Sequence, residues 1–364
     1  MRIAVGIVDL FGGGGLQRDC LEVRASLQRR GHVVDLYAAR CEPALAERHG
    51  VRVLASRALT NHGRDAAFGR AFRAECSVGY DIRVGFNKLP GLDVLYCADR
   101  SVAARPLATW QRLLPRHRTR HMLEASCFGQ DASTVVLLLS PTAAGEYQAA
   151  WRTPPARLRL LPPTIARSRI RPELRTAGQR NTLRAALGCE AAEIAWLFAA
   201  TQPHTKGLDR VLDALSAQPD AQLHIAGVGA EQNKAAAALR QAEKHGIASR
   251  VHWLGHREDM PALMAAADIL VPPARYDMTG QVILEALAMG LPVVTTAACG
   301  FAVHVERAGA GVVLSEPFDR AALAAALAQA ADHLGRGRLL GNPAKRGAQA
   351  LGAEELARGI HRLG

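Results

Sequence analysis

Short apolar segments alternate with longer amphipathic ones along most of the chain, an order typical of β-α-β units in which a covering helix follows each parallel strand. In the first half, a helix is predicted near residues 16–30, directly after a glycine-rich turn. The strands predicted there lie at residues 2–9, 33–38, 51–54, 82–86, 94–98 and 134–140. This half is therefore expected to form a parallel sheet.

A second alternating series follows a stretch rich in arginine, proline and serine. Residues 157–163 read RLRLLPP, and because adjacent prolines continue neither a helix nor a central strand, we expect a hinge over about 157–180. Beyond it the pattern predicts strands at 194–201, 222–227, 251–255, 268–273 and 292–296, and helices at 207–217, 231–245, 260–267 and 280–290. Two Rossmann-like halves fit this order, and a Rossmann domain joined to a different second domain fits it as well.

Length and composition agree with a two-domain globular protein. A chain of 364 residues exceeds one usual hydrophobic core, and 49% hydrophobic with 21% charged residues excludes extensive disorder. The first residues resemble a strand more than a signal peptide, and no apolar run approaches the roughly 20 residues that span a bilayer, so we expect a cytoplasmic protein. Seven cysteines without a CxxC spacing indicate reduced, buried thiols, not a disulfide framework or a zinc site.

The net charge of +12 predicts attraction to an anionic partner, which composition leaves open between nucleic acid, a phosphorylated substrate and a lipid surface. Basic residues gather at 101–123, a segment with five arginines, two histidines and no acid, interleaved with Trp110, Leu113 and Met122. At an anionic bilayer each arginine contributes about 1 kcal/mol, so reversible docking is one interpretation and a solvated basic helix is the other. Nucleic-acid binding is less favoured, since no stacking platform or reading motif accompanies the segment.

The first predicted strand runs into a glycine-rich turn, FGGGGLQRD at residues 11–19. Glycine lets backbone N–H groups approach a ligand, and the N-terminus of the following helix favours a phosphate. The turn lacks both the GxGxxG spacing and a Walker lysine. A phosphate site around Gly14 and Gly15 and a merely flexible strand-to-helix turn are equally compatible with it.

Polar clusters follow two further predicted strands, TNHGR at 60–64 and GFNKLPGLDV at 85–94, and Asp99 follows a third. Open α/β sheets bind ligands at the carboxyl ends of their strands, which favours a functional role for these residues. Ordinary turn chemistry explains the same residue types, and a helix N-cap is the structural alternative for Asp99.

Two features make the second half a candidate for binding a phosphorylated ligand. Lys206 stands where a strand is followed by a helix, a position that suits a diphosphate, although taken alone it favours an ordinary surface lysine. Asp277 precedes a predicted helix that carries Glu285 eight residues later. Eight helical residues advance by about 800°, which leaves the two carboxylates roughly 80° apart and able to address one cleft. An N-cap is the alternative role for Asp277, yet this pair is the most specific marker in the chain.

Six spaced segments, in order, carry a resemblance to glycosyltransferase family 4 and, within it, to the lipopolysaccharide core glucosyltransferase I (WaaG-type) group. They are GGLQRD (14–19), TNHGR (60–64), VGFNKLPGLDV (84–94), LPP (161–163), LMAAAD (263–268) and LEA with GLPVVTTAACG (284–300). The resemblance covers nearly the whole chain. It implies an α/β GT-B fold, with two Rossmann-like domains and the active site in the interdomain cleft.

The domains that the resemblance implies are an acceptor-binding one over 1–163 and a nucleotide-sugar-binding one over 164–343, with a helix in 344–364 that packs back on the first. The implied activity is transfer of a hexose from a UDP-sugar to the inner-core heptose of lipopolysaccharide, with retention and without a metal. Protein cations and helix-end N–H groups would stabilise the departing diphosphate in the metal's place. Segment 101–123 falls where the family contacts the membrane, which implies a peripheral protein on the cytoplasmic face of the inner membrane.

The resemblance also assigns a catalytic set. Asp19 would lie at the acceptor side and Asp99 near the reacting carbon of the hexose. Lys206 would neutralise the diphosphate, and Asp277 would contact the donor hexose.

The donor nucleotide-sugar would be held by a second set: Gly14, Gly15, Thr205, Lys206, Arg257, Met278, Thr279, Gly280, Gln281 and Glu285. Among these, Gly15 would offer its backbone N–H to the distal phosphate, Arg257 would contact the nucleobase, and Glu285 would hold the ribose hydroxyls.

Two positions depart from the family pattern. Asp277 stands where glutamate is usual, and Thr205 where an arginine usually precedes the lysine, which removes a bidentate phosphate partner. A changed donor sugar is the favoured consequence. A non-catalytic homologue that binds the nucleotide-sugar or the lipopolysaccharide core is the alternative. An NAD-dependent oxidoreductase is suggested by the glycine turn alone, and the missing GxGxxG argues against it.

Overall fold

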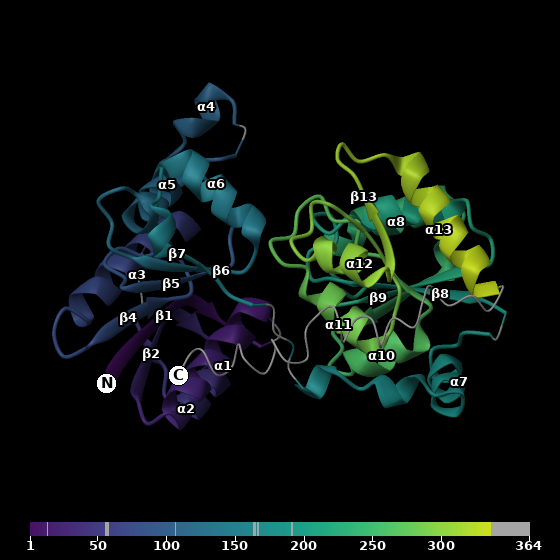
Figure 1. The fold of residues 1–364 in the computed structure, drawn as a ribbon, viewed down its shortest axis with the longest axis horizontal. Coiled ribbons are helices and arrows are strands. Elements are labelled where there is room, and N and C mark those ends of the chain that lie inside the picture. The colour runs from purple at the N-terminus through teal and green to yellow at the C-terminus, as the bar shows by residue number, and fades with distance from the viewer. Residues whose placement is uncertain are drawn as a thin grey trace. The chain divides into compact units, whose positions relative to one another are not determined.

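The structure is a computed structural model that describes residues 1–335 apart from 13, 55–57, 106, 163–164, 166 and 191. The chain divides into two compact units, Met1–Leu161 and a second one that begins at Pro162 (Figure 1). The domain boundary expected after residue 163 therefore lies two residues beyond the observed one, which follows Leu161. The helix expected in 344–364 lies outside the described residues.

The first unit is a parallel sheet with helices between successive strands, except that β5 follows β4 without a helix. Its elements are β1 Arg2–Leu10, α1 Gly15–Arg29, β2 Val33–Cys41, α2 Pro43–His49, β3 Arg52–Val53, α3 Asn61–Glu75, β4 Ile82–Gly85, β5 Val94–Cys97, α4 Thr109–Arg112, α5 Pro115–Phe128, β6 Val135–Leu138, α6 Pro141–Trp151 and β7 Leu158–Leu160. The strands pair in the order β3-β2-β1-β4-β5-β6-β7. The order reverses between β1 and β4, which makes this the doubly wound Rossmann arrangement.

The second unit repeats that arrangement with six strands. Its elements are α7 Ala177–Ala186, β8 Ile194–Ala199, α8 Leu208–Ser216, β9 Ala221–Ala226, α9 Ala236–Lys244, β10 Val251–Gly255, α10 Met260–Ala266, β11 Ile269–Leu270, α11 Gln281–Met289, β12 Val293–Thr296, α12 Ala302–Ala308, β13 Gly311–Leu314 and α13 Arg320–Gly335. The strands run parallel in the order β10-β9-β8-β11-β12-β13. Here the order reverses between β8 and β11.

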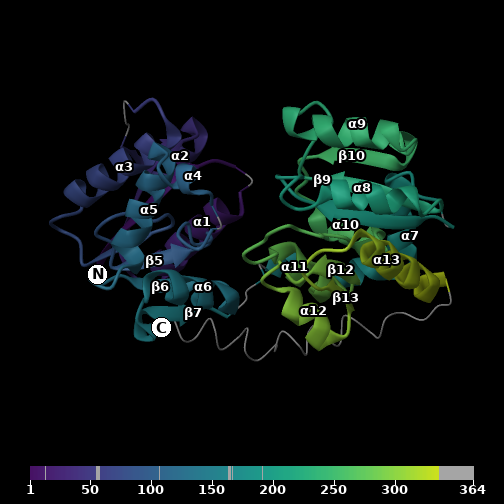
Figure 2. The same cartoon turned by 90° about the horizontal axis from the view of Figure 1, so that it is seen from above.

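Helices cover both faces of each sheet, as the turned view also shows (Figure 2). In the first unit Leu36 packs with α1 in one cluster, whereas the next residue, Tyr37, lies edge-on to Phe72 of α3. Neighbouring residues of a strand point to opposite faces, so a strand buried on both sides must be apolar at nearly every position. This is why the strands appear in the sequence as continuous apolar runs.

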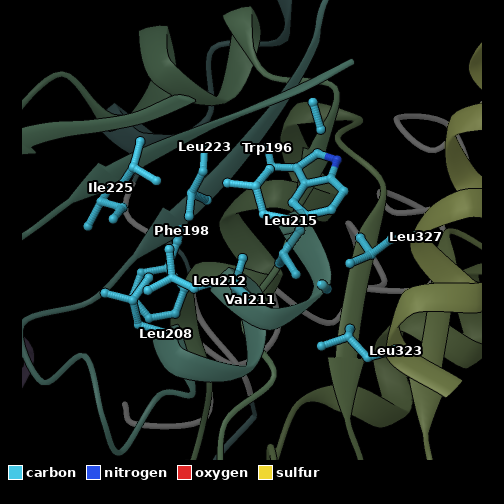
Figure 3. Packing of buried hydrophobic residues seen from close by; sticks show 14 of the residues in the cluster. Trp196, Phe198, Leu208, Val211, Leu212, Leu215, Leu223, Ile225, Leu323 and Leu327 are labelled. Carbon is cyan, nitrogen blue, oxygen red and sulfur yellow. The ribbon is translucent and has the colours of Figure 1, made fainter. Parts of the chain in front are cut away.

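The second core is built around β8 and α8. Trp196 and Phe198 pack against leucines of α8, β9 and α13 on one face (Figure 3), and Leu197 packs with α10 and α11 on the other. Each such fully buried side chain stabilises the fold by roughly 1.5–3 kcal/mol. This core holds in place the turns that follow β8 and β11.

Several predicted boundaries needed correction. Residues 158–160 form β7 and pair with β6, so the start of the expected hinge belongs to the first sheet. The helix predicted at 231–245 is a 3-10 turn followed by α9, and the strand predicted at 268–273 is only two residues long. The second difference has a simple cause, since Pro272 and Pro273 lack the N–H groups that a central strand donates.

Candidate active site

The carboxyl ends of β1, β4 and β5 border a cavity of about 360 Å³ in the first unit. The residues that line it are Val8, Asp9, Phe11, Leu16, Gln17, Asp65, Asn87, Lys88, Asp99, Arg100, Val102, Arg105, Arg120 and Leu123. This edge is where the strand order reverses, the position at which doubly wound sheets bind their ligands. Of the predicted catalytic residues, Asp99 lines this cavity.

The glycine turn is shaped by Gln17. The amide of Gln17 donates to the carbonyl oxygen of Asp9 at 3.0 Å, and a Cβ on Gly14 would lie 1.9 Å from its Oε1 atom. Gly14 is the N-cap of α1, and Gly15 is the first helical residue. A Cβ on Gly15 would meet nothing within 4 Å. A side chain at position 14 would therefore displace the Gln17 amide from its contact with Asp9, whereas the glycine at 15 leaves the helix N-terminus accessible.

Asp19 lies on α1 and turns toward β5. Its carboxylate accepts a hydrogen bond from the hydroxyl of Tyr96 at 3.0 Å. Burial raises the pKa of Asp19, and the Tyr96 bond opposes that shift. Asp19 is not among the residues that line the 360 Å³ cavity in the described part of the chain.

Two polar residues that follow β4, Asn87 and Lys88, line the cavity and also hold neighbouring segments in place. Asn87 accepts from the backbone N–H of Val8 at 2.7 Å, which ties the end of β4 to β1. The ammonium of Lys88 pairs with Glu124 at 2.6 Å and donates to the carbonyl oxygen of Arg100 at 2.7 Å. Turn chemistry alone does not explain this pair, because the two side chains come from distant segments.

Glu124, on α5, is fully buried at 0% exposure and organises the loop after Asp99. Besides Lys88, its carboxylate accepts from the Ser101 hydroxyl, the N–H groups of Val102 and Ala103, and the indole N–H of Trp151. Burial alone would raise the pKa of Glu124, but the Lys88 ammonium and these donors hold it below the ordinary value. Residues 101–103 are thereby fixed beside the cavity.

Asp99 does not cap a helix. It lies in a bend after β5, and the next helix in the chain, α4, begins only at Thr109. Its carbonyl oxygen accepts from the hydroxyl of Tyr147 at 2.8 Å, which fixes the backbone. The N-cap alternative for Asp99 is therefore wrong.

The TNHGR segment at 60–64 is the start of α3. Thr60 is the N-cap, and its hydroxyl accepts from the N–H of Gly63 at 3.2 Å, so helix capping accounts for this part of the motif. The next residue, Asp65, lines the 360 Å³ cavity. Burial raises the pKa of Asp65, and Arg120 counteracts that shift.

In the second unit, Lys206 and Asp277 meet. Lys206 follows β8 and Asp277 follows β11, the two strands between which the order reverses. The ammonium lies 2.6 Å from the Asp277 carboxylate. The same carboxylate accepts from the N–H of Thr279 at 3.3 Å. The structure thus brings together two of the predicted catalytic residues at the edge where a ligand is expected.

Asp277 is not the N-cap of the helix that follows. Gly280, at φ 73°, occupies that position, and α11 runs from Gln281 to Met289. Asp277 instead pairs through its backbone with Ala298 and Gly300 in a bridge. Since a left-handed glycine separates it from the helix, the rotation calculated for the pair with Glu285 does not apply. Glu285 itself is buried at 6% exposure on α11.

The turn that carries Thr205 and Lys206 is held by Arg275. The guanidinium of Arg275 pairs with both oxygens of Asp209, at 2.7 and 2.6 Å, and donates to the carbonyl oxygen of His204. Its backbone N–H donates to the carbonyl oxygen of Thr205. A guanidinium therefore stands beside this turn, although residue 205 is a threonine.

Of the remaining residues predicted to bind the donor sugar nucleotide, Met278, Thr279 and Gln281 lie close after Asp277 in the chain, and Arg257 lies elsewhere in the second unit. Arg257, after β10, forms a two-contact ion pair with Asp259. Met278 is buried, and Thr279 accepts from the N–H of Phe301 at 2.7 Å. Gln281 begins α11. Their contacts with a donor remain predictions.

The described residues contain neither a cluster of metal ligands nor a membrane-spanning helix. No group of three or more His, Cys, Asp and Glu residues in the described ranges is placed to hold a metal ion. Nor does the described part of the chain contain a helix with the length and apolar character of a membrane span.

Comparison with known proteins decides the family. Residues 179–334 match the model of glycosyl transferases group 1. Lipopolysaccharide glucosyltransferase WaaG of Escherichia coli (strain K12) is 34% identical over 327 residues, which cover 88% of this chain and 87% of that protein. The chain belongs to the WaaG family of group 1 glycosyltransferases. The resemblance seen in the six motifs is confirmed.

Solved structures agree with the GT-B architecture. The crystal structure of WaaG, a glycosyltransferase involved in lipopolysaccharide biosynthesis, matches with a TM-score of 0.89 at 30% identity and covers 99% of this chain and 98% of that one. Sucrose-phosphate synthase from Thermosynechococcus elongatus matches with a TM-score of 0.77 at 22% identity, over 100% and 98% of the two chains, and shares the fold. The expected fold class of two Rossmann-like halves is confirmed.

The sequence did not predict the residues that hold the site in place through contacts with residues far away in the chain. Glu124 had one usable signal, because it is the first acid after Asp99 and directly follows the acid-free segment 101–123. Gln17 lies inside a quoted motif, but nothing in the sequence shows that it fills the space beside Gly14. The pair of Arg275 with Asp209 has no local signal.

Proposed function

We propose that this chain transfers a hexose from a UDP-sugar to the inner-core heptose of lipopolysaccharide, with retention of configuration and without a metal ion. The observation that carries the proposal is the 34% identity with a lipopolysaccharide glucosyltransferase over 88% of the chain. A match of that extent must span most of both units and is not confined to one of them.

In this proposal the donor is bound at the edge formed by the segments after β8 and β11. The Lys206 ammonium is positioned to bind a diphosphate, and the N-terminus of α11 adds N–H donors and a partial positive charge. Asp277 contacts the hexose, Glu285 the ribose hydroxyls and Arg257 the nucleobase. When the diphosphate arrives, its negative charge competes with Asp277 for Lys206, which frees a carboxylate oxygen for a sugar hydroxyl.

The acceptor sugar is proposed to occupy the 360 Å³ cavity of the first unit. Its wall combines carboxylates and amides, which suit sugar hydroxyls, with arginine side chains. Asp99 lies near the reacting carbon, Asp19 lies on the acceptor side, and the N–H of Gly15 reaches the distal phosphate. Glu124 keeps the loop beside Asp99 in place, which is a positioning role.

The chemical step then balances within donor and acceptor. The bond from the anomeric carbon to the diphosphate oxygen breaks, and a bond from the same carbon to the acceptor hydroxyl oxygen forms on the same face. A phosphate oxygen of the leaving group takes the hydroxyl proton. Lys206 and the N–H groups of α11 stabilise the charge that builds on the diphosphate.

The test is incubation with a set of radiolabelled UDP-hexoses and a core acceptor truncated at the heptose, with a chelator in parallel reactions. We expect transfer from at least one UDP-hexose, an unchanged rate with chelator, and a retained anomer in the product by NMR. Absence of transfer from every UDP-sugar would contradict the proposal.

The departures at Thr205 and Asp277 motivate one alternative, a homologue that binds the nucleotide-sugar or the core without turning it over. Measurable UDP affinity with zero turnover, together with activity in the Thr205→Arg, Asp277→Glu double variant, would support that alternative. Transfer by the unaltered chain excludes it.

A further inference from the structure

A second cavity of about 340 Å³ lies in the first unit beside α4 and α5. Its wall contains three arginines and two histidines: Arg105, Arg112, His117, Arg118 and His121. No aspartate or glutamate is among the lining residues in the described part of the chain. The cavity is thus a concave site lined by groups that donate hydrogen bonds to anions.

The arginines of this cavity differ from several others in the unit that pair with carboxylates. Arg100 pairs with Glu146 at 2.8 Å, and Arg83 pairs with Asp93 at 2.8 Å. Among the described residues, no carboxylate pairs with Arg105, Arg112 or Arg118. Three guanidinium groups without an internal counter-ion therefore face one hollow, where a bound anion would relieve their mutual repulsion.

The positive charge of these arginines also affects a histidine of the cavity, His117. The pKa of His117 is lowered first by burial and then by His121, Arg112 and Arg105. The ring of His121 rests on Trp151, with centroids 4.7 Å apart, and the indole N–H of Trp151 donates to Glu124 at 2.7 Å. The buried carboxylate that fixes the loop after Asp99 therefore anchors this wall as well.

Arg105 joins this cavity to the one next to Asp99, because it lines both. The loop that carries it is held by the bonds from Val102 and Ala103 to Glu124. An acceptor whose sugar ring occupies the 360 Å³ cavity beside Asp99 can thus place a substituent past Arg105 in the 340 Å³ cavity.

We propose that the cavity beside α4 and α5 is an acceptor subsite that binds an anionic substituent, a phosphate or a carboxylate, carried next to the reacting sugar. This inference rests on the proposed function. It differs from docking at a membrane surface, because docking depends on the summed charge of the segment, whereas a subsite depends on the side chains that line the cavity.

Segment 101–123 offers a matched pair of variants that can distinguish an acceptor subsite from docking at a membrane surface. Arg116 and Arg118 are both exposed residues of α5, and only Arg118 lines the cavity. Arg118→Gln and Arg116→Gln therefore remove the same charge from the same helix at little risk to the fold. The substrate is a water-soluble, deacylated core oligosaccharide, used with its charged substituents intact, after phosphatase treatment and after reduction of its carboxylates.

We expect Arg118→Gln to raise the acceptor KM about tenfold or more with the charged oligosaccharide and to leave kcat and the donor KM unchanged. Arg116→Gln should behave like the unaltered protein. Removing the recognised substituent should raise the KM of the unaltered protein to that of Arg118→Gln and abolish the difference between them.

Equal effects of the two variants on the soluble acceptor would overturn the subsite. So would an effect of Arg118→Gln confined to retention on anionic vesicles, which would assign the cavity to a lipid headgroup. If the unaltered chain transfers no sugar, the proposed function fails separately, and calorimetric binding of the same oligosaccharides still decides the subsite. In that measurement tight binding lost only in Arg118→Gln supports it, and equal binding by both variants overturns it.

Discussion

At the scale of single residues, the contact between Lys206 and Asp277 shows how a departure from the family pattern is accommodated. Aspartate is one methylene shorter than the usual glutamate, yet its carboxylate lies 2.6 Å from the lysine ammonium. Asp277 also leaves the helix path, since Gly280 caps α11 instead. The position is retained while the reach of the carboxylate is reduced, which is the physical reason to expect a changed donor preference.

Lys206→Met tests the role of the ammonium at this edge. We expect kcat to fall by about 100-fold or more, because the variant loses a preorganised charge that stabilises the departing diphosphate. Steady-state kinetics with the best UDP-hexose provide the measurement, and circular dichroism checks that the fold is intact.

Lys244→Met is the matched control for that prediction. Lys244 is an exposed residue of α9, so its substitution removes the same charge and should leave kcat unchanged. A Lys206→Met protein with the kcat of the unaltered chain would contradict the assigned role.

At the scale of elements, the buried Glu124 links α5, the loop at 101–103, α6 and the end of β4. It does so through five donors that come from separate parts of the first unit. A carboxylate in that position is tolerated only because each of its contacts is a hydrogen bond or an ion pair. Removing it leaves the nearly buried Lys88 without its counter-charge.

Glu124→Ala is therefore expected to destabilise the protein by about 3–5 kcal/mol. Glu146→Ala, which breaks the more exposed pair with Arg100, should cost about 1 kcal/mol or less. Urea unfolding followed by circular dichroism compares the two. Equal losses in both variants would show that Glu124 does not organise this region.

A second element-scale feature is a histidine pair on β9 and β10. His224 is buried at 2% exposure, its ring stacks on His252, and its Nε2 atom lies 3.2 Å from the sulfur of Cys189. Burial, then His252 and Arg184, lower the pKa of His224 from 6.5 to about 4. The folded state therefore keeps this ring neutral at a pH where the unfolded chain protonates it.

The contribution of His224 to the free energy of unfolding should consequently be constant well above pH 6.5 and fall as the pH is lowered from 6.5 toward 4. At pH 5 the loss from this one group is on the order of 2 kcal/mol. Urea unfolding at pH 7.5 and pH 5 measures it. His224→Leu should lose much of the pH dependence, and His245→Asn, at an exposed pair with Asp213, should retain it. The same slope in all three proteins would refute the assignment.

At the scale of the whole molecule, the charge of +12 is unevenly placed. Segment 101–123 carries five arginines, and its apolar side chains Trp110, Leu113 and Met122 are exposed at 64%, 71% and 54%. Basic and apolar groups on one exposed segment are the combination that binds the surface of an anionic bilayer. Membrane association remains a proposal, and its test is direct.

We expect vesicles containing anionic lipid to retain the protein at low salt and to release it at about 1 M salt, where the Debye length shrinks to about 3 Å. Cosedimentation measures the retained fraction, and vesicles of neutral lipid provide the control. Equal retention by neutral vesicles would rule out the electrostatic explanation.

The sequence by itself determined two successive series of strands alternating with helices, because strands buried on both faces must be continuous apolar runs and the helices between them amphipathic. It also placed Lys206, Asp277 and Asp99 at strand ends, since those ends follow directly from the strands. Only the tertiary structure decided that Lys206 meets Asp277 and that Glu124 holds Lys88 and the loop after Asp99. Such contacts depend on which strands become neighbours and on where each side chain points, and a local pattern of apolar and polar positions carries neither.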